Sequence, residues 1–375
     1  MKQLQFTKKD TNIAKGLFLI MMIIHHLFYD YDTFGNFNVS FVFLSAHQVI
    51  VIAQYFKLCI AGFTMLTFYG MTKKYMQLSQ EAYSRQIVPN TINKIISLVM
   101  SFLFVYVLSA ITALALKDDL TMLYSRNEKS WLGYAVVDAL GMADFFHTPT
   151  LNVTWWYMSF VIVLIFLFQI YYKLYQRLGV ITVPVAALLP GALLMEQTYY
   201  GLCAFSMILG IFAAETDLFV RMRKFGCGNK IIKGAKCIVC AATFLITYQL
   251  LFYGISVSLY FGIGAVLWTY VSYEFLAPLK GVGGIVSFIG KHSMNIFLTH
   301  TFLYYYYAKD FIYSFGSGIM IVTVLLGCSL AISVCIEGLK KAVRYSKLIN
   351  YLQVKAVCCY DSCRRSGFSN CEENT

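Results

Sequence analysis

Charged residues are scarce in this sequence of 375 residues. Asp, Glu, Lys and Arg together make up 13% of it, whereas an ordinary soluble domain contains about 25%. Apolar residues make up 59%, and most of them stand in long runs. A water-soluble globular domain is therefore excluded, and the composition indicates an integral membrane protein whose first partner is the lipid bilayer.

The sequence also lacks any long polar stretch that would fold as a soluble domain. The longest connections between apolar runs are about residues 117–153 and the tail from residue 339. A cleavable secretory signal is not expected, because the first run has no small-residue cleavage site and contains His25 and His26. Any chemistry must therefore take place within the bundle of membrane helices.

Proline is rare, and the five prolines are spread along the chain. Many transporters have paired helix breaks and inverted repeats, but here the histidine-bearing first run has no counterpart in the second half. These absences argue against a transporter or flippase for a glycan or a small anionic solute. That class remains the alternative to an enzyme, because buried histidines and a buried lysine also suit proton-coupled transport.

The apolar runs are long enough to cross a membrane as helices, which takes about 17 to 25 residues each. We expect an all-α fold, namely a polytopic membrane helix bundle of about ten transmembrane helices. The predicted spans are about residues 13–29, 42–69, 94–116, 154–173, 180–195, 199–216, 234–252, 254–273, 285–307 and 316–338.

The formal net charge of +12 predicts the topology of the chain. Short cytoplasmic loops collect Lys and Arg, and an even number of spans puts both termini on one side. We therefore expect both termini to be cytoplasmic and the chain to be a multi-pass protein of the cell membrane, a bacterial plasma membrane. A nucleic-acid partner is not expected, because the basic residues follow the topology. They gather in four places: Lys2 to Lys15, Lys73 to Lys94, Arg221 to Lys233, and Lys340 to Arg365.

Most of the eleven cysteines offer no specific chemistry. Six lie in or beside apolar spans, where a thiol behaves as a small hydrophobe. Cys237 and Cys240 have the spacing of a redox or metal motif, but on an apolar helix we interpret them as packing residues. For the tail we expect a disordered, reduced segment, with metal binding or lipidation as open alternatives for Cys358, Cys359, Cys363 and Cys371.

Ionisable residues inside the first and ninth spans are the candidates for function, because such residues are costly in a membrane. His25 and His26 lie near the outer end of the first span. Lys15 precedes His26 by eleven residues, about three helical turns, so both lie on one face about 16 Å apart. In the ninth span, Ser293 and His300 share a face at a spacing of seven residues. His26 and His300 are predicted to lie at similar depth.

Two further segments carry polar or aromatic candidates. Lys57 lies in the inner half of the second span, where an uncompensated lysine costs about 2.5–3.5 kcal/mol on insertion scales. The spans offer few carboxylates to pair with it, which leaves room for a phosphate-bearing ligand. The fourth span opens with Asn152, Trp155, Trp156 and Tyr157, and paired tryptophans at such a position are typical interfacial anchors.

These segments resemble the acyltransferase 3 family of integral membrane acyltransferases, in order, from about residue 10 to residue 340. In the first segment Lys15 stands where the family commonly has arginine, and lysine lacks the planar fork that binds phosphate or carboxylate bidentately. Tyr69-Gly70 stands where the family commonly has Ser-Gly, so no role is carried over there. The matching segments are Lys15-Gly16 with His25-His26, Lys57 to Met65, Asn152 to Tyr157, and Gly290 to His300, the last being the most specific.

The resemblance implies an O-acetyltransferase that moves an acyl group, most often acetyl, from acyl-CoA to a hydroxyl. The acceptor would be a cell-surface polysaccharide or lipid-linked glycan, acetyl-CoA would be the co-substrate, and no metal is expected. His26 would act as the general base or accept the acyl group transiently, since histidine titrates near neutrality. His25 is a further catalytic candidate, while His300 and Ser293 would orient the acceptor or stabilise the oxyanion.

The remaining candidates are expected to bind the two substrates. Lys15 and Lys57 would hold the phosphates or pantetheine of the donor, and Asn152, Trp156 and Tyr157 would bind the acceptor. The transmembrane domain is predicted over residues 1–340 and a basic, cysteine-containing cytoplasmic tail over 341–375. Either the chain acts alone, or it hands the acyl group to a separate extracytoplasmic acyltransferase partner.

Overall fold

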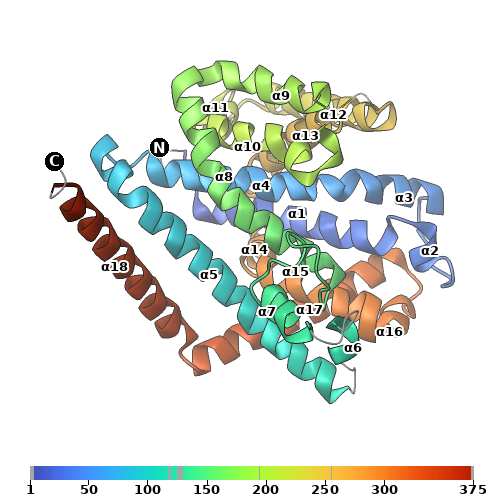
Figure 1. The fold of residues 1–375 in the computed structure, drawn as a ribbon. Coiled ribbons are helices and arrows are strands. Elements are labelled where there is room, and N and C mark those ends of the chain that lie inside the picture. The colour runs from blue at the N-terminus through green and yellow to red at the C-terminus, as the bar shows by residue number, and fades with distance from the viewer. Residues whose placement is uncertain (1–3, 117–119, 125–129, 194, 255, 373–375) are drawn as a thin grey trace. The chain divides into compact units, whose positions relative to one another are not determined.

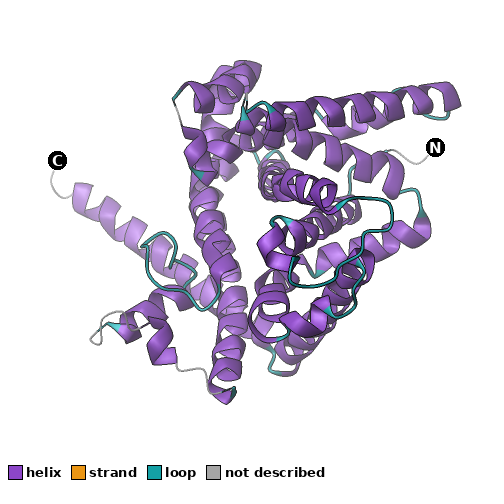
Figure 2. Ribbon diagram, turned by 90° about the vertical axis from the view of Figure 1, so that its right-hand side faces the viewer, coloured by secondary structure: helices purple, strands orange, loops and turns teal. Residues whose placement is uncertain are grey.

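Helices make up nearly all of the structure. The computed structural model describes residues 4–116, 120–124, 130–193, 195–254 and 256–372, and within these ranges it contains no strand (Figure 2). The all-α class is thus confirmed. Its long helices are α1 (Lys8–Phe28), α4 (Cys59–Tyr75), α5 (Gln80–Ala115), α8 (Trp156–Leu178), α10 (Tyr199–Glu215), α12 (Lys230–Phe252), α13 (Val257–Val271), α17 (Gly318–Ala342) and α18 (Tyr345–Glu372).

A helix lies in each of the ten segments predicted to span the membrane. Among the described residues, however, six helical stretches are both long and apolar enough to cross a bilayer. A seventh is obtained if α10 and α11 (Leu218–Lys224), which meet at 61°, form one bent span. The fourth and fifth predicted spans, which include α9 (Thr182–Ala192), form one continuous stretch from Val153 to Ala192, and other helices such as α13 are short. A membrane-embedded helical protein is therefore supported, and the count of ten remains a prediction.

The chain divides into two compact units. Unit 1 consists of residues 1–77 and 168–333, and unit 2 of residues 78–167 and 334–375. Helices α8 and α17 each contribute to both units. The predicted boundary between a transmembrane domain and a tail at residues 340 and 341 stays a prediction, and the tail belongs to the same compact unit as α5.

Unit 1 is built around α10, which packs against α4 and α13 (Figure 1). Nearly every residue of α10 is buried, as expected of a helix that is apolar on all sides. Helix α1 packs against α4 and, further along, against α3 (Ala46–Tyr55). It begins with a capping box in which Thr7 and Asp10 satisfy each other's backbone N–H groups.

The second predicted span is one broken helix. Its two halves, α3 and α4, are joined by η1 (Phe56–Leu58), a single turn of 3-10 helix with Lys57 at its centre. The ninth predicted span also breaks, at His292, between α14 (Lys280–Lys291) and α15 (Ser293–Thr301). The π-helix η6 (Phe302–Tyr307) then follows α15. These breaks occur without proline, which is why the sequence did not reveal them.

Unit 2 holds the helices α5, α6 (Leu120–Tyr124), α7 (Trp131–Ala139) and α18. Helix α18 lies along α5 (Figure 1), where Tyr345 donates to the Met100 carbonyl and Gln353 to the Asn93 carbonyl. The expectation of a disordered tail is therefore wrong. Cys358, Cys359 and Cys363 are exposed on this helix, and Cys371 lies outside the side chains that the structure describes.

Candidate functional site

Two glycines bring α1 and α14 into close contact. A side chain on Gly16 would overlap the carbonyl oxygen of Val286, and one on Gly290 would overlap the carbonyl oxygen of Asn12. Small residues at a crossing let two helix backbones approach closely, which is a common way of packing helices in membranes. The glycines therefore fix where α1 and α14 cross.

The crossing also sets the register of two histidines. His26 follows Gly16 by ten residues, and His300 follows Gly290 by ten residues, about 15 Å along each helix. Helices α14 and α15 both pack against α1, and both histidines reach the same level. Their ring centroids lie 5.1 Å apart. The predicted match in depth is thus a direct contact, and α15 packs against α1 (Figure 1).

Backbone carbonyls fix the tautomers of two histidines at this site. Nδ1 of His25 lies 2.8 Å from the carbonyl oxygen of Ala53, and Nδ1 of His300 lies 2.8 Å from that of Phe297. A carbonyl oxygen only accepts hydrogen bonds, so Nδ1 carries the hydrogen in both rings. In the neutral rings Nε2 is left as the acceptor.

His26 differs from both neighbours. Its ring lies between those of His25, at 5.2 Å, and His300, at 5.1 Å, and its side chain is half-buried. Within the described part of the chain, neither ring nitrogen of His26 makes a hydrogen bond to protein. A general base needs a nitrogen that is free to take a proton from a substrate. Nε2 of His25 also offers such a nitrogen, but His26 has both ring nitrogens unbonded and lies between the other two rings, so we take it as the first candidate.

Tyr304 completes the cluster and was missed in the sequence. Its ring stacks on His300 at 5.7 Å and lies 6.2 Å from His26. Tyr304 stands four residues after His300, a spacing that puts side chains on one helix face. That spacing was a usable signal. Tyr304 lies in the π-helix η6, and π-helical turns occur frequently at functional sites.

The two lysines lie apart from each other. The contacts of His25 with Ala53 and of Phe18 with Gly62 show how α1 lines up with α3 and α4. By that register, Lys57 lies about one helical turn nearer to the N-terminal end of α1 than His26 does. Its ammonium lies 5.9 Å from the ring centroid of Tyr199 on α10. The structure therefore does not bring Lys57 to Lys15.

Neither lysine has a carboxylate partner among the described residues. Glu274 does not pair with either of them, because its carboxylate accepts a hydrogen bond from Lys236 at 3.2 Å. Glu337 pairs with Lys340 at 3.0 Å. Lys15 and Lys57 are half-buried, and unpaired cations in such places suit an anionic ligand.

Ser293 is not part of the histidine cluster. It is the first residue of α15, two turns or about 10 Å along the helix from His300. The neighbouring His292 is buried, and its Nδ1 lies 2.8 Å from the hydroxyl of Ser333 on α17. A role for Ser293 in orienting the acceptor thus remains a prediction.

The predicted acceptor residues belong to unit 2. Asn152 is fully buried and caps the short helix η2 (Val153–Trp155), with its side-chain oxygen accepting from the Thr154 N–H. Trp155 packs edge-on against Phe102 of α5 at 4.9 Å. Trp156 and Tyr157 begin α8 and are half-buried. The segment is thus anchored through Asn152 and Trp155.

A buried carboxylate holds the chain next to Asn152. The side chain of Asp138, which is fully buried, accepts hydrogen bonds from the Leu151 N–H at 2.8 Å, the Thr150 hydroxyl at 2.9 Å and the Tyr124 hydroxyl at 3.0 Å. Asp138 lies outside the candidate spans. Burial raises the pKa of Asp138 to about 6, and the donated hydrogen bonds oppose that rise. The sequence signal was a single acid in the apolar stretch of α7.

No group of three or more His, Cys, Asp or Glu side chains within the described ranges is arranged to hold a metal ion. Comparison of the chain with models of protein families, with curated proteins and with solved structures finds no match.

Proposed function

We propose that the protein is an integral membrane acyltransferase that moves an acetyl group from acetyl-CoA to a hydroxyl of a cell-surface polysaccharide or lipid-linked glycan. The observation that carries the proposal is His26, a histidine with unbonded ring nitrogens held between two histidines whose tautomers are fixed. Support also comes from the sequence resemblance to the acyltransferase 3 family. The matching segments include the predicted first and ninth spans, which carry these histidines.

The proposed reaction needs one base and one site for developing negative charge. His26 takes the proton of the acceptor hydroxyl while the hydroxyl oxygen attacks the thioester carbonyl. The carbon–sulfur bond then breaks, and the departing CoA thiolate takes the proton from His26 and leaves as the thiol, which returns His26 to its neutral form. Nε2 of His300, once protonated, is the nearby donor to the oxyanion. His25 keeps His26 in place through ring contact.

The substrates are proposed to meet from opposite sides of the membrane. In the proposed topology ten spans put both termini in the cytoplasm, and Lys15 lies at the inner end of α1. An acetyl group at His26 lies about 16 Å from Lys15 along the helix, so an extended pantetheine arm would bridge them. Lys57 lies between these levels. On the sequence resemblance, Asn152, Trp156 and Tyr157 of unit 2 would bind the glycan.

The test is acetyl-CoA turnover by the purified full-length protein in detergent, measured with radiolabelled acetyl-CoA as free CoA released and as label moved to cell-envelope glycan. His26→Ala is expected to lower turnover by about 10² to 10⁴-fold, the usual contribution of a general base. His47→Ala is the matched control, because His47 is an exposed histidine at the start of α3. Its turnover should equal that of the wild type.

Two outcomes would contradict the proposal. Equal turnover in His26→Ala and the wild type, with both proteins folded, would remove His26 from the reaction. Absence of acetyl-CoA use in the wild type, with every glycan preparation tried, would remove the acetyltransferase itself.

Helix breaks favour a second candidate, a proton-coupled transporter. Transporters often bind their cargo where membrane helices are interrupted, and α3 and α4 are interrupted at Lys57 close to the histidine cluster. In that case the protein, reconstituted in liposomes, would move a labelled anionic glycan precursor under a proton gradient without consuming acetyl-CoA.

A further inference from the structure

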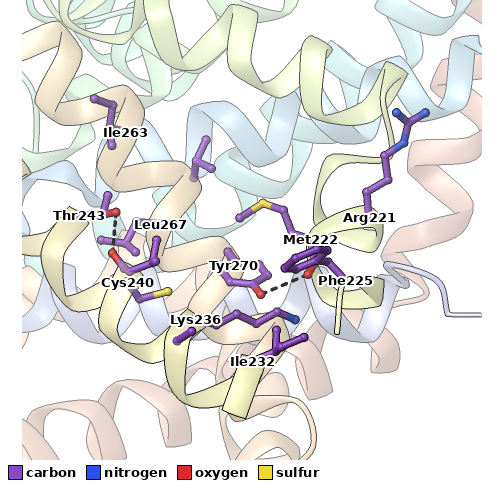
Figure 3. A pocket seen from close by; sticks show the side chains of 13 residues that line it. Arg221, Met222, Phe225, Ile232, Lys236, Cys240, Thr243, Ile263, Leu267 and Tyr270 are labelled. Carbon is purple, nitrogen blue, oxygen red and sulfur yellow. Dashed lines mark hydrogen bonds between the residues drawn. The ribbon is translucent and has the colours of Figure 1, made fainter. Parts of the chain in front are cut away.

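A pocket in unit 1 lies away from the histidine cluster, between α11, α12 and α13 (Figure 3). Its volume is about 550 Å³, within the range of about 300 to 1,000 Å³ typical of small-molecule sites. Apolar side chains form most of its wall. Thr243 and Ile263 lie toward one end, and Arg221, Met222 and Phe225 lie toward the other (Figure 3).

The shape of the pocket is that of a groove along one helix face. Its lining residues on α12 recur at helical spacing from Ile232 through Lys236, Val239 and Cys240 to Thr243. These eleven residues of separation correspond to about 16 Å. The facing wall is the stripe of α13 that ends at Tyr270. A long, thin, apolar ligand fits this shape better than a compact one.

The groove opens toward lipid. Helix α12 is a candidate membrane span, and few of its residues are buried inside the protein. Ile238, next to the lining residue Val239, is 72% exposed. In a membrane protein such an apolar, exposed helix face is covered by hydrocarbon. The ligand can therefore enter from the bilayer without crossing water.

Two cationic side chains, Lys236 and Arg221, line the groove, and they differ in whether a carboxylate pairs with them. Lys236 donates to Glu274 at 3.2 Å, and each side chain of this pair is only about a tenth exposed, so the pair is neutral overall. Arg223 lies over the ring of Tyr273 at 4.4 Å. Arg221 is exposed and has no carboxylate partner among the described residues. A cation without a partner at the end of an apolar groove complements an anionic head group.

We propose that this groove binds one acyl chain of an anionic phospholipid, with the lipid phosphate at Arg221. Lys224, Lys230 and Lys233 lie on the helix ends and turn that follow Arg221, and they add positive charge at the same end. Basic residues beside a membrane helix bind anionic lipids by this electrostatic attraction. The proposal is independent of the acetyltransferase, because it concerns another part of unit 1.

The two cysteines of α12 provide a matched pair of variants. Cys240 is half-buried and lines the groove, whereas Cys237 is exposed and does not. Phenylalanine at residue 240 fills the groove, and phenylalanine at residue 237 adds the same apolar volume on the lipid side. Val266→Phe fills the groove from α13. Loss of binding in both variants would therefore not be explained by a distortion of α12 alone.

The experiment titrates the purified full-length protein in detergent with dioleoylphosphatidylglycerol, or with dioleoylphosphatidylcholine, and counts bound lipid by native mass spectrometry. The wild type and Cys237→Phe should bind phosphatidylglycerol about tenfold more tightly than phosphatidylcholine, the effect of one charge-assisted contact. Cys240→Phe and Val266→Phe should lose about tenfold in affinity for phosphatidylglycerol. Arg221→Gln should lose most of the preference for phosphatidylglycerol, and the neighbouring lysines account for what remains. Thermal unfolding confirms that each variant is folded.

Three results would overturn the proposal. Equal binding of the two lipids by the wild type would show that no anionic head group is recognised. Unchanged phosphatidylglycerol binding by folded Cys240→Phe and Val266→Phe would place the lipid elsewhere. Displacement of the lipid by palmitoyl-CoA at equal concentration would identify an acyl-CoA as the occupant instead.

Discussion

The three histidines of the cluster differ in the hydrogen bonds that their ring nitrogens make. His25 and His300 each give their Nδ1 hydrogen to a backbone carbonyl, which locks the ring orientation. His26 makes no such bond within the described residues, and its ring lies against those of His25, His300 and Tyr304. An imidazole held in this way is oriented but keeps its nitrogens for a ligand, which is the combination a general base requires.

The buried carboxyl group of Asp138 leads to a prediction about the pH dependence of stability. Its pKa, raised to about 6 by burial, means that the folded protein holds the proton more tightly than the unfolded chain. Its contribution to stability is therefore full below about pH 4 and is lost as the pH rises through about 6. The loss amounts to about 3 kcal/mol at most, at 1.36 kcal/mol for each unit of pKa. Thermal unfolding in detergent at pH 4.5 and pH 7.5 measures it.

Variants separate this effect from the general pH dependence of the protein. Asp138→Asn removes the titration but also loses an acceptor for one of the three donors, at a cost of about 1–3 kcal/mol. The stability of the wild type relative to Asp138→Asn should fall between pH 4.5 and pH 7.5. Glu81→Gln, at an exposed site on α5, should show no such change. A constant difference for Asp138→Asn across this range would contradict the assignment.

At the scale of elements, the close contact of α1 and α14 determines where the histidines meet. The crossing at Gly16 and Gly290 acts as a fixed point, and equal spacings of ten residues on the two helices carry His26 and His300 to one level. A shift of one residue in either helix would turn a histidine by about 100° and separate the rings. The contact thus depends on backbone packing some distance away.

Gly290→Ala tests this dependence. The added methyl group overlaps the Asn12 carbonyl, so the helices must move apart, at a cost of about 1–3 kcal/mol. We expect a lower midpoint of thermal unfolding and lower acetyl-CoA turnover. Gly284→Ala, on the same helix but with open space around the added atom, should be neutral or slightly stabilising. Equal midpoints for the two variants would refute a tight crossing.

At the scale of the whole molecule, the number of helices that cross the bilayer decides on which side each terminus lies. Six or seven stretches of the described chain can cross a bilayer by length and composition, whereas the predicted topology has ten spans. Six or ten spans put both termini on one side, and seven put them on opposite sides. The positive-inside rule favours the cytoplasm for both termini and for the turn between α11 and α12.

Reporter fusions in a bacterial host test this topology. Green fluorescent protein fused after Asn229 or after Thr375 should fluoresce, because it matures in the cytoplasm. Alkaline phosphatase fused after Asp32 or after Glu196 should be active, because it needs the outer side. Phosphatase activity after Thr375 would contradict the even number of spans, and fluorescence after Glu196 would show that the fifth predicted segment does not cross.

The sequence by itself determined the helical class, the membrane setting and the residues worth testing. These depend on local composition and on spacing within one helix, which the chain carries wherever its neighbours lie. Tertiary structure decided what depends on contacts between distant segments: the pairing of His26 with His300, the partner of Glu274, the position of Lys57 and the packing of the tail on α5. Spacing shows which residues share a helix face, but only packing shows what that face meets.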